Sequence, residues 1–214
     1  MRRLQVPMKA RVAALAAGAL WLSAALGNAV AGPVVLDPGS RLWIQGTSTI
    51  HDWESKATRL EFSIEPAVED ELESLVRGGG VTAGTLRVPV AEMKSHKDGL
   101  DKNMRKALSA DRHPMIEFHL VKYTVTAHAG ADSFLVKADG KLKIAGVEKP
   151  VEIETGARRE GAGLRLRGRE PVLMSDYGIK PPVMMLGTVK TGNEVMVYFD
   201  LLLLPDTTSA EAKP

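Results

Sequence analysis

Apolar and polar residues alternate with a period of two along most of this chain. Leu42 and Ile44 are apolar, whereas their neighbours Arg41 and Gln45 are polar. Because successive side chains of a β-strand point to opposite faces, this alternation is typical of a strand with one buried face. The pattern recurs at residues 60–64, 86–90, 116–120, 134–144, 151–153, 164–166 and 195–203. We therefore predict eight strand-sized segments and an all-β fold.

Glycine-rich turn signals separate many of these segments, at residues 77–80, 129–132, 146–150, 160–163 and 191–193. No helix-length crossover alternates with the strands, so consecutive strands are expected to pair in an antiparallel sheet. A sheet with one apolar face must close on itself or pack against another layer. The pattern alone does not choose between these arrangements.

One segment breaks the alternation. Between Asp98 and Ala110 the apolar residues Leu100, Met104 and Leu108 are spaced four apart, which is the spacing of one side of an amphipathic helix. Asp98 is expected to cap the start of this helix. We predict a short helix after the third strand, lying across one end of the sheet with its apolar side inward.

The first 31 residues differ from the rest and indicate a secretion signal. Basic residues at the start are followed by an apolar run over 12–27 and by the small residues of Ala29-Val30-Ala31, which together are typical of a cleaved signal peptide. The run is rich in Ala and Gly, whereas a membrane anchor usually carries more Leu, Ile and Phe. We expect cleavage after Ala31 and export to the periplasm. The predicted division is a signal peptide at 1–31, one domain at 32–206 and a disordered polar tail at 207–214.

Charge and cysteine content narrow the function classes. The whole chain has a formal charge of +2, and removal of residues 1–31 leaves 24 basic and 26 acidic residues, a charge of −2. This near-neutral chain lacks the basic footprint of a nucleic-acid-binding protein. Cysteine is absent, so thiol chemistry and disulfides are excluded and the domain must be held by its core.

The stretch GTSTIHDWE places Ser48, His51 and Asp52 within five residues. A serine nucleophile needs its base within hydrogen-bond reach, yet in a strand the side chains of Ser48 and His51 point to opposite faces. Ser, Thr and Asp also bond readily to nearby backbone groups and shape turns. We therefore interpret this stretch as a bend, while a hydrolase or isomerase using His51 and Asp52 beside an apolar pocket stays open as an alternative.

No metal site is predicted. The five histidines show neither H-x-x-x-H nor H-x-H spacing; they are His51, His96, His113, His119 and His128. The thioethers of Met174, Met184, Met185 and Met196 are candidate Cu(I) ligands. Methionine more often fills irregular apolar space, and we favour that interpretation.

Several segments in a fixed order resemble a known family. The stretch TSTIHDWE, the helical DGLDKNMRKALSADRHP leading into MIEFHL, the hairpin LKIAGVEKPVEI and the closing GNEVMVYFDLLL are together similar to the YceI-like, polyisoprenoid-binding proteins. The resemblance runs from about Val34 to Leu204. It implies a lipocalin-like, eight-stranded antiparallel β-barrel whose interior holds a long isoprenoid or quinone lipid, with no established catalytic machinery and no further cofactor.

The resemblance and the alternation together predict ligand-lining residues. They are Trp43, Ile44, Trp53, Phe62, Ile64, Leu86, Val88, Met104, Leu108, Ile116, Phe118, Leu142, Ile144, Met184, Met185, Val197, Phe199 and Leu201. Met104, Leu108, Met184 and Met185 are expected to gate the open end. The expected partner is a lipid or isoprenoid, with no nucleic acid and no stable membrane insertion, because the outward positions carry charges where a membrane barrel would be apolar. A solidly packed envelope stress protein without a ligand, and a homodimer, both stay open.

Overall fold

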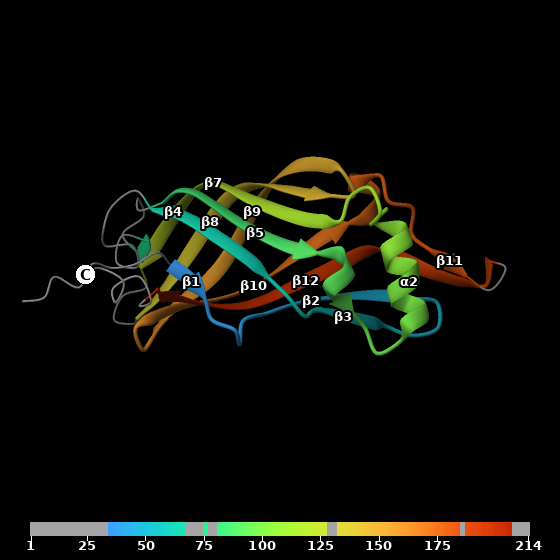
Figure 1. Cartoon of the computed structure of the whole chain (residues 1–214), viewed down its shortest axis with the longest axis horizontal. Coiled ribbons are helices and arrows are strands. Elements are labelled where there is room, and N and C mark those ends of the chain that lie inside the picture. Colours follow the sequence, from blue (N-terminus) through green and yellow to red (C-terminus); the bar gives the residue numbers. More distant parts are fainter. Residues whose placement is uncertain (1–33, 67–74, 77–80, 128–131, 185–186, 207–214) are drawn as a thin grey trace, which may run out of the picture.

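The computed structural model describes residues 34–66, 75–76, 81–127, 132–184 and 187–206 (Figure 1). The predicted signal peptide and polar tail lie outside these residues. The same holds for the predicted turn at 77–80, for most of the one at 129–132, and for Met185. Strands dominate the described part of the chain, as the alternation predicts.

Twelve strands form one antiparallel sheet. Their bounds are β1 Val34–Leu36, β2 Arg41–Ser48, β3 Trp53–Ala57, β4 Glu61–Pro66, β5 Val81–Pro89, β6 Met93–Lys94, β7 Met115–Ala127, β8 Ser133–Ile144, β9 Val147–Glu160, β10 Gly163–Leu173, β11 Val183–Met184 and β12 Val189–Pro205. Hydrogen-bonded neighbours follow the order β4-β5-β7-β8-β9-β10-β12-β2-β3-β6, and β1 and β11 each pair with β12. The sheet is strongly curled, with its long strands wrapped around an elongated interior (Figure 1).

The expected eight-stranded barrel is therefore wrong as a description of these strands. Two long extended segments are interrupted at the same level: β3 and β4 by residues 58–60, and β5 and β6 by the 3-10 helix η1, Val90–Glu92. At this bend the Thr58 amide and hydroxyl both donate to the Glu92 carbonyl oxygen, at 2.9 and 3.0 Å. The hydrogen-bonded path consequently begins at β4 and ends at β6 instead of closing.

The predicted helix is present as α2, Asp98–Ala107. It crosses one end of the curled sheet (Figure 1). Six described strands precede α2 instead of the predicted three, because β1, β3 and β6 are too short to show a clear alternation. Asp98 is not the cap: Lys97 takes that position without a side-chain hydrogen bond. The Asp101 carboxylate instead accepts a hydrogen bond of 2.8 Å from the Ser95 amide, which fixes the loop that leads into the helix.

The segment after β10 contains the 3-10 helix η2, Met174–Tyr177, and the short strand β11, Val183–Met184. The expected turn at 191–193 lies inside β12, where the pairing with β2 shifts register between Thr191 and Val195. A local irregularity therefore takes the place of a turn, since one strand can absorb extra residues as a bulge without ending.

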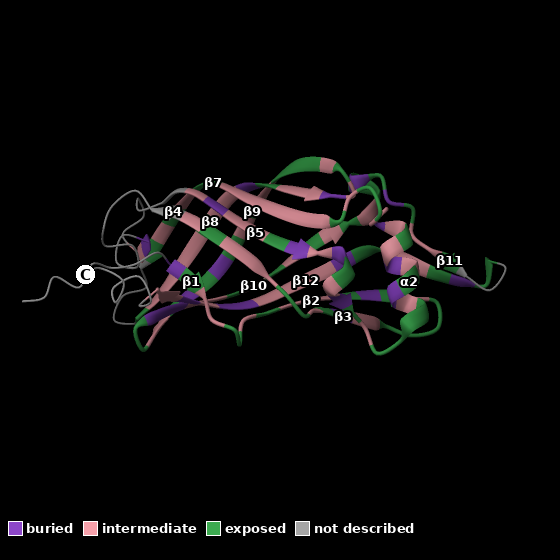
Figure 2. Ribbon diagram, in the orientation of Figure 1, coloured by how far each residue is buried: buried purple, intermediate pink, exposed green. Residues whose placement is uncertain are grey.

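Two groups of buried residues lie in the interior, and Figure 2 colours the buried positions purple. One lies beside α2 and includes Val90, Met93, Met104 and Tyr177. The other brings together the ends of β1, β9, β10 and β12 and includes Val34, Ala157, Leu164 and Leu203. Alternation explains the second group, because every second residue of each strand faces inward. The first group draws mainly on η1, α2 and η2.

Candidate functional site

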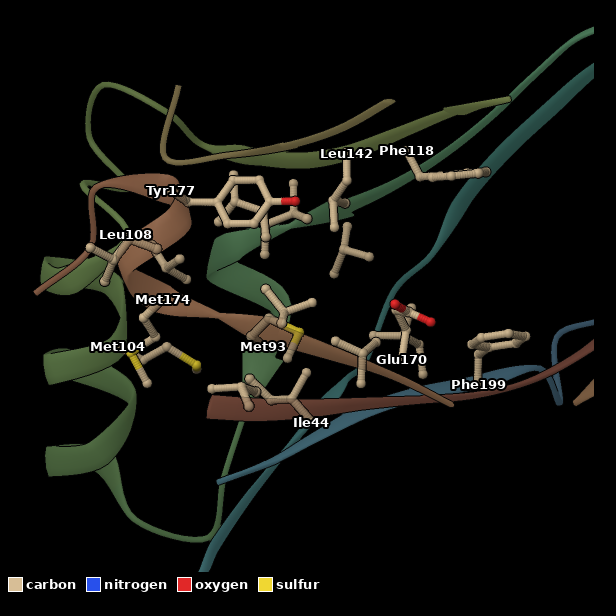
Figure 3. Close-up of a pocket in the computed structure, with 18 of the residues that line it drawn as sticks. Ile44, Met93, Met104, Leu108, Phe118, Leu142, Glu170, Met174, Tyr177 and Phe199 are labelled. Atoms are coloured by element: carbon tan, nitrogen blue, oxygen red, sulfur yellow. The ribbon is translucent and has the colours of Figure 1, made fainter. Parts of the chain in front are cut away.

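A cavity of about 300 Å³ lies inside the curled sheet, next to α2. This volume is at the lower end of the range for small-molecule sites. Its wall is almost entirely apolar, and α2 and η2 contribute to it beside the strands (Figure 3). The interior is therefore not packed solid.

Most of the predicted ligand-lining residues do line this cavity. They are Ile44, Trp53, Leu86, Val88, Met104, Leu108, Ile116, Phe118, Leu142, Ile144, Val197, Phe199 and Leu201. They come from β2, β3, β5, α2, β7, β8 and β12, so the fold brings together side chains that are far apart in sequence. Their placement is established by the structure, whereas their contact with a ligand stays a prediction.

The remaining predicted residues lie elsewhere. Trp43 is on the opposite face of β2 from Ile44 and stacks on Tyr198. Phe62 and Ile64 pack against the buried group around Leu203. The backbone of Met184 forms part of β11, whereas its side chain and Met185 lie outside the described residues. The expected gate of Met104, Leu108, Met184 and Met185 therefore stays a prediction.

Two cavity phenylalanines each lie over a glycine on the neighbouring strand. The Phe118 ring covers Gly140 of β8, and the Phe199 ring covers its direct cross-strand partner Gly168 of β10. A β-carbon at either glycine would collide with the ring. The two glycines therefore let the aromatic rings lie flat along the wall, which keeps the space between the strands open.

Sequence reasoning missed the lining residues of η1–β6 and η2. Met93, Met174, Tyr177 and Ile179 all line the cavity, but they lie in short irregular segments where no periodicity identifies the inward face. Met174, which was a candidate Cu(I) ligand in the sequence, packs against apolar side chains. Glu170 also lines the cavity. The sequence could have identified it, because it occupies a position of β10 where the alternation predicts an apolar residue, as at Leu166 and Val172.

Polar atoms are few on this wall. Thr155 is already satisfied, since its hydroxyl donates a 2.7 Å hydrogen bond to the Arg167 carbonyl oxygen. Glu170 and Tyr177 differ from it: neither side chain forms a hydrogen bond with another described residue. Burial raises the pKa of the Glu170 carboxyl. Burial also raises the pKa of the Tyr177 hydroxyl, and the nearby Asp176 and Glu170 carboxyls raise it further.

Apart from Glu170, none of the described charged side chains lines the cavity. None of the described Lys, Arg or His side chains lines the cavity. The largest outer cluster surrounds Asp200, which pairs with Arg41, Arg165 and Arg167 at 3.0, 2.8 and 3.2 Å. Burial opposes ionisation of Asp200, but the hydrogen bonds from the arginines prevail and lower its pKa to about 2. The site is therefore an apolar interior enclosed by a charged exterior.

The serine, histidine and aspartate of the GTSTIHDWE stretch form a bend, as the sequence indicates. The Ser48 hydroxyl donates a 2.7 Å hydrogen bond to the His51 carbonyl oxygen and accepts one from the His51 amide. The side chains of His51 and Asp52 are exposed between β2 and β3, and neither lines the cavity. The His51 ring nitrogen faces the Lys97 ammonium at 3.4 Å, so the stretch joins two surface loops.

Within the described residues no group of three or more His, Asp or Glu side chains is arranged to hold a metal ion. No helix in that part of the chain has the length and apolar character needed to cross a membrane.

Comparison with protein families gives one match. The sequence model of the YceI-like domain matches residues 44–203, which include most of the cavity wall. A comparison with curated proteins gave no match.

Solved structures with a similar fold exist. BcnA from Burkholderia cenocepacia aligns with a TM-score of 0.59 at 16% identity, over 78% of this chain and 99% of that one. A polyisoprenoid-binding domain from Saccharophagus degradans, implicated in plant cell wall breakdown, aligns with a TM-score of 0.63 at 14% identity, over 81% and 98%. The YCEI protein of Campylobacter jejuni aligns with a TM-score of 0.52 at 12% identity, over 69% and 82%. At these identities the likeness establishes the fold.

Proposed function

Because the chain belongs to the family of YceI-like domains, we propose that it is a periplasmic protein that sequesters or carries a long-chain isoprenoid or similar lipid inside its curled sheet. The observation that carries this proposal is the apolar cavity beside α2. The polyisoprenoid-binding domain of similar fold supports the choice of ligand class. The predicted signal peptide at 1–31 supports the location.

Simple energetics agree with such a ligand. Burial of each CH₂ group contributes about 0.8 kcal/mol, so about fifteen buried carbons contribute roughly 12 kcal/mol. Association costs at least about 4 kcal/mol of this. The remainder, about 8 kcal/mol, corresponds to roughly micromolar affinity. The tail therefore needs no specific polar partner in order to bind.

The proposal is tested by extracting protein purified from its native source and analysing the organic phase by mass spectrometry. We expect one isoprenoid species in stoichiometric amount. Protein that is consistently empty and also fails to take up polyprenols and quinones in vitro would overturn the proposal. The mass of the mature chain from the same preparation tests cleavage after Ala31, and an uncleaved chain in the cytosolic fraction would contradict export.

A pair of variants tests whether the cavity is the binding site. Ala138→Phe places an aromatic ring at a position that lines the cavity, whereas Val121→Phe places the same ring at a position that is 60% exposed. We expect Ala138→Phe to abolish lipid uptake and Val121→Phe to leave it unchanged. If Ala138→Phe fails to fold, Ala138→Leu gives a smaller obstruction, and unchanged uptake by that folded variant would place the ligand elsewhere.

A further inference from the structure

Glu170 and Tyr177 line the cavity with polar groups that form no hydrogen bond with another described residue. Tyr177 in η2 is 5% exposed, and its hydroxyl forms no hydrogen bond with another described residue. A polar group on an apolar cavity wall usually meets water or a ligand. In Figure 3 this hydroxyl points into the cavity.

Glu170 approaches the same space from β10. Its cross-strand partner is Val197 of β12, and both residues line the cavity. The other inward positions of this part of β10 are Leu166, Gly168 and Val172, so Glu170 is the one ionisable residue in this series. Figure 3 shows its carboxyl group and the Tyr177 hydroxyl directed into the cavity from different walls. Glu170 also influences Tyr177 electrostatically.

We propose that Glu170 and Tyr177 bind the polar head of the ligand and select an uncharged hydroxyl, as in a prenyl alcohol or a phenol, over an anionic head such as a phosphate. This inference rests on the proposed function, because it assumes that the cavity holds an apolar tail. A hydroxyl both donates and accepts, so it can donate to a Glu170 oxygen while it accepts from the Tyr177 O–H.

An anionic head group would be disfavoured in this cavity. No cationic side chain among the described residues lines the cavity, so a buried phosphate would have no countercharge, and burial of an unpaired charge is strongly unfavourable. Glu170 adds repulsion whenever it is ionised. The head of the ligand would lie between η2 and β10, close to α2, with the tail directed along the interior away from α2.

The test compares ligands with the same C20 prenyl chain and different heads: geranylgeraniol, geranylgeranyl phosphate and the corresponding hydrocarbon. Equilibrium dialysis of delipidated protein against each labelled compound gives the affinities. We expect the wild type to bind the alcohol at least about tenfold more tightly than the phosphate, since one or two hydrogen bonds and one unpaired charge separate them.

Variants assign this selectivity to the two residues. Tyr177→Phe is expected to weaken alcohol binding by about five- to tenfold while leaving hydrocarbon binding unchanged. Glu170→Gln is expected to bind the phosphate more tightly than wild type, because the repulsion is gone, and to bind the alcohol within about threefold of wild type. Thr155→Val is the control, because it removes a hydroxyl that lines the same cavity but is already bonded to Arg167, and its selectivity should equal that of wild type.

The outcomes separate the two proposals. If wild type binds none of the three compounds, the carrier function fails and this inference fails with it. If wild type binds the hydrocarbon, alcohol and phosphate equally, or if Glu170→Gln and Tyr177→Phe keep wild-type selectivity, the headgroup inference fails while the carrier function stands. Thermal unfolding of each variant verifies that it is folded.

Discussion

Trp43 and Tyr198 stack on the outer face of the sheet, with ring centroids 5.3 Å apart and ring planes 6° from parallel. The two residues are direct cross-strand partners in β2 and β12. Their sequence neighbours Ile44, Val197 and Phe199 line the cavity. The stack is therefore a contact between strands and not part of the ligand site.

We predict that Trp43→Ala destabilises the protein and leaves lipid affinity within about twofold of wild type. A stacked aromatic pair contributes about 1 kcal/mol beyond its buried area, and a double-mutant cycle with Tyr198→Ala should recover a coupling of that size in urea unfolding. A tenfold loss of lipid affinity in Trp43→Ala would show that this face takes part in binding.

Gly168→Ala should destabilise the protein by about 1–3 kcal/mol, because overpacking forces neighbouring groups to move. The added methyl group would collide with the Phe199 ring, which lines the cavity, so lipid affinity should fall as well. Gly99→Ala in α2 is the matched control. Open space surrounds a β-carbon there, and Ala favours a helix over Gly by about 1 kcal/mol. Equal unfolding midpoints for the two variants would contradict the proposed role of Gly168.

The Asp200 cluster should make stability depend on pH in the acid range. The pKa of Asp200 is lowered from 3.8 to about 2 in the folded protein, so its ionised form is stabilised by folding. That contribution is fully present above pH 3.8 and is lost as the pH falls through about 2. A shift of this size corresponds to about 2 kcal/mol at neutral pH.

Asp200→Asn should therefore lower the free energy of unfolding at pH 7 by about 2 kcal/mol or more, since Arg165 also loses a partner. The variant should lose less of its stability on acidification than the wild type. Asp139→Asn is the control: its carboxylate is 40% exposed and pairs with Lys122 on the surface, where an ion pair contributes about 0–1 kcal/mol. Parallel stability profiles for wild type and Asp200→Asn between pH 2 and pH 5 would contradict the assignment.

Asp101→Ala should loosen α2. Asp101 is 5% exposed and accepts the Ser95 amide; burial raises its pKa, but the hydrogen bonds from Ser95 outweigh burial and the pKa is lowered overall. Loss of this contact should cost about 1–3 kcal/mol. We expect faster hydrogen exchange in α2 and faster release of bound lipid, because Met104 of α2 and Leu108, the residue after its last turn, line that end of the cavity. Asp98→Ala, which removes an exposed carboxylate from the same helix, should change neither rate.

Much of the fold follows from the sequence, because period-two alternation determines which side chains of a strand share a face. The long strands β7 to β10 and the helix α2 are predicted by periodicity alone. The number of strands is not, since two-residue strands such as β6 carry no period. The register irregularity inside β12 shows the same limit, because Gly192 and Asn193 favour a turn by their residue type, whereas the structure places them in the interval of β12 where the pairing with β2 shifts register.

The sequence predicts only part of the cavity wall, because alternation identifies inward residues in long strands and not in short irregular segments. Ile44 and Trp43 were both proposed as lining residues, although alternation permits only one of two neighbours to face inward. Phe62 faces inward but packs against the group of buried residues around Leu203. Alternation indicates which face of a strand a residue occupies, but it does not indicate how far along the interior that residue lies. Glu170 could have been identified as a carboxylate at a position of β10 where the alternation predicts an apolar residue. Tyr177 could not, since η2 is a single irregular turn.

The bend shared by β3–β4 and β5–β6 has a mechanical consequence. On one side of the molecule the strands are long and unbroken, whereas on the other side two adjacent strands are interrupted together and are linked there through Thr58 and Glu92. We expect the interrupted side to deform more easily, because a segment with fewer strand hydrogen bonds opens at lower cost. A ligand of larger cross-section would then be accommodated by movement at this bend, with the strand pairs opposite kept intact.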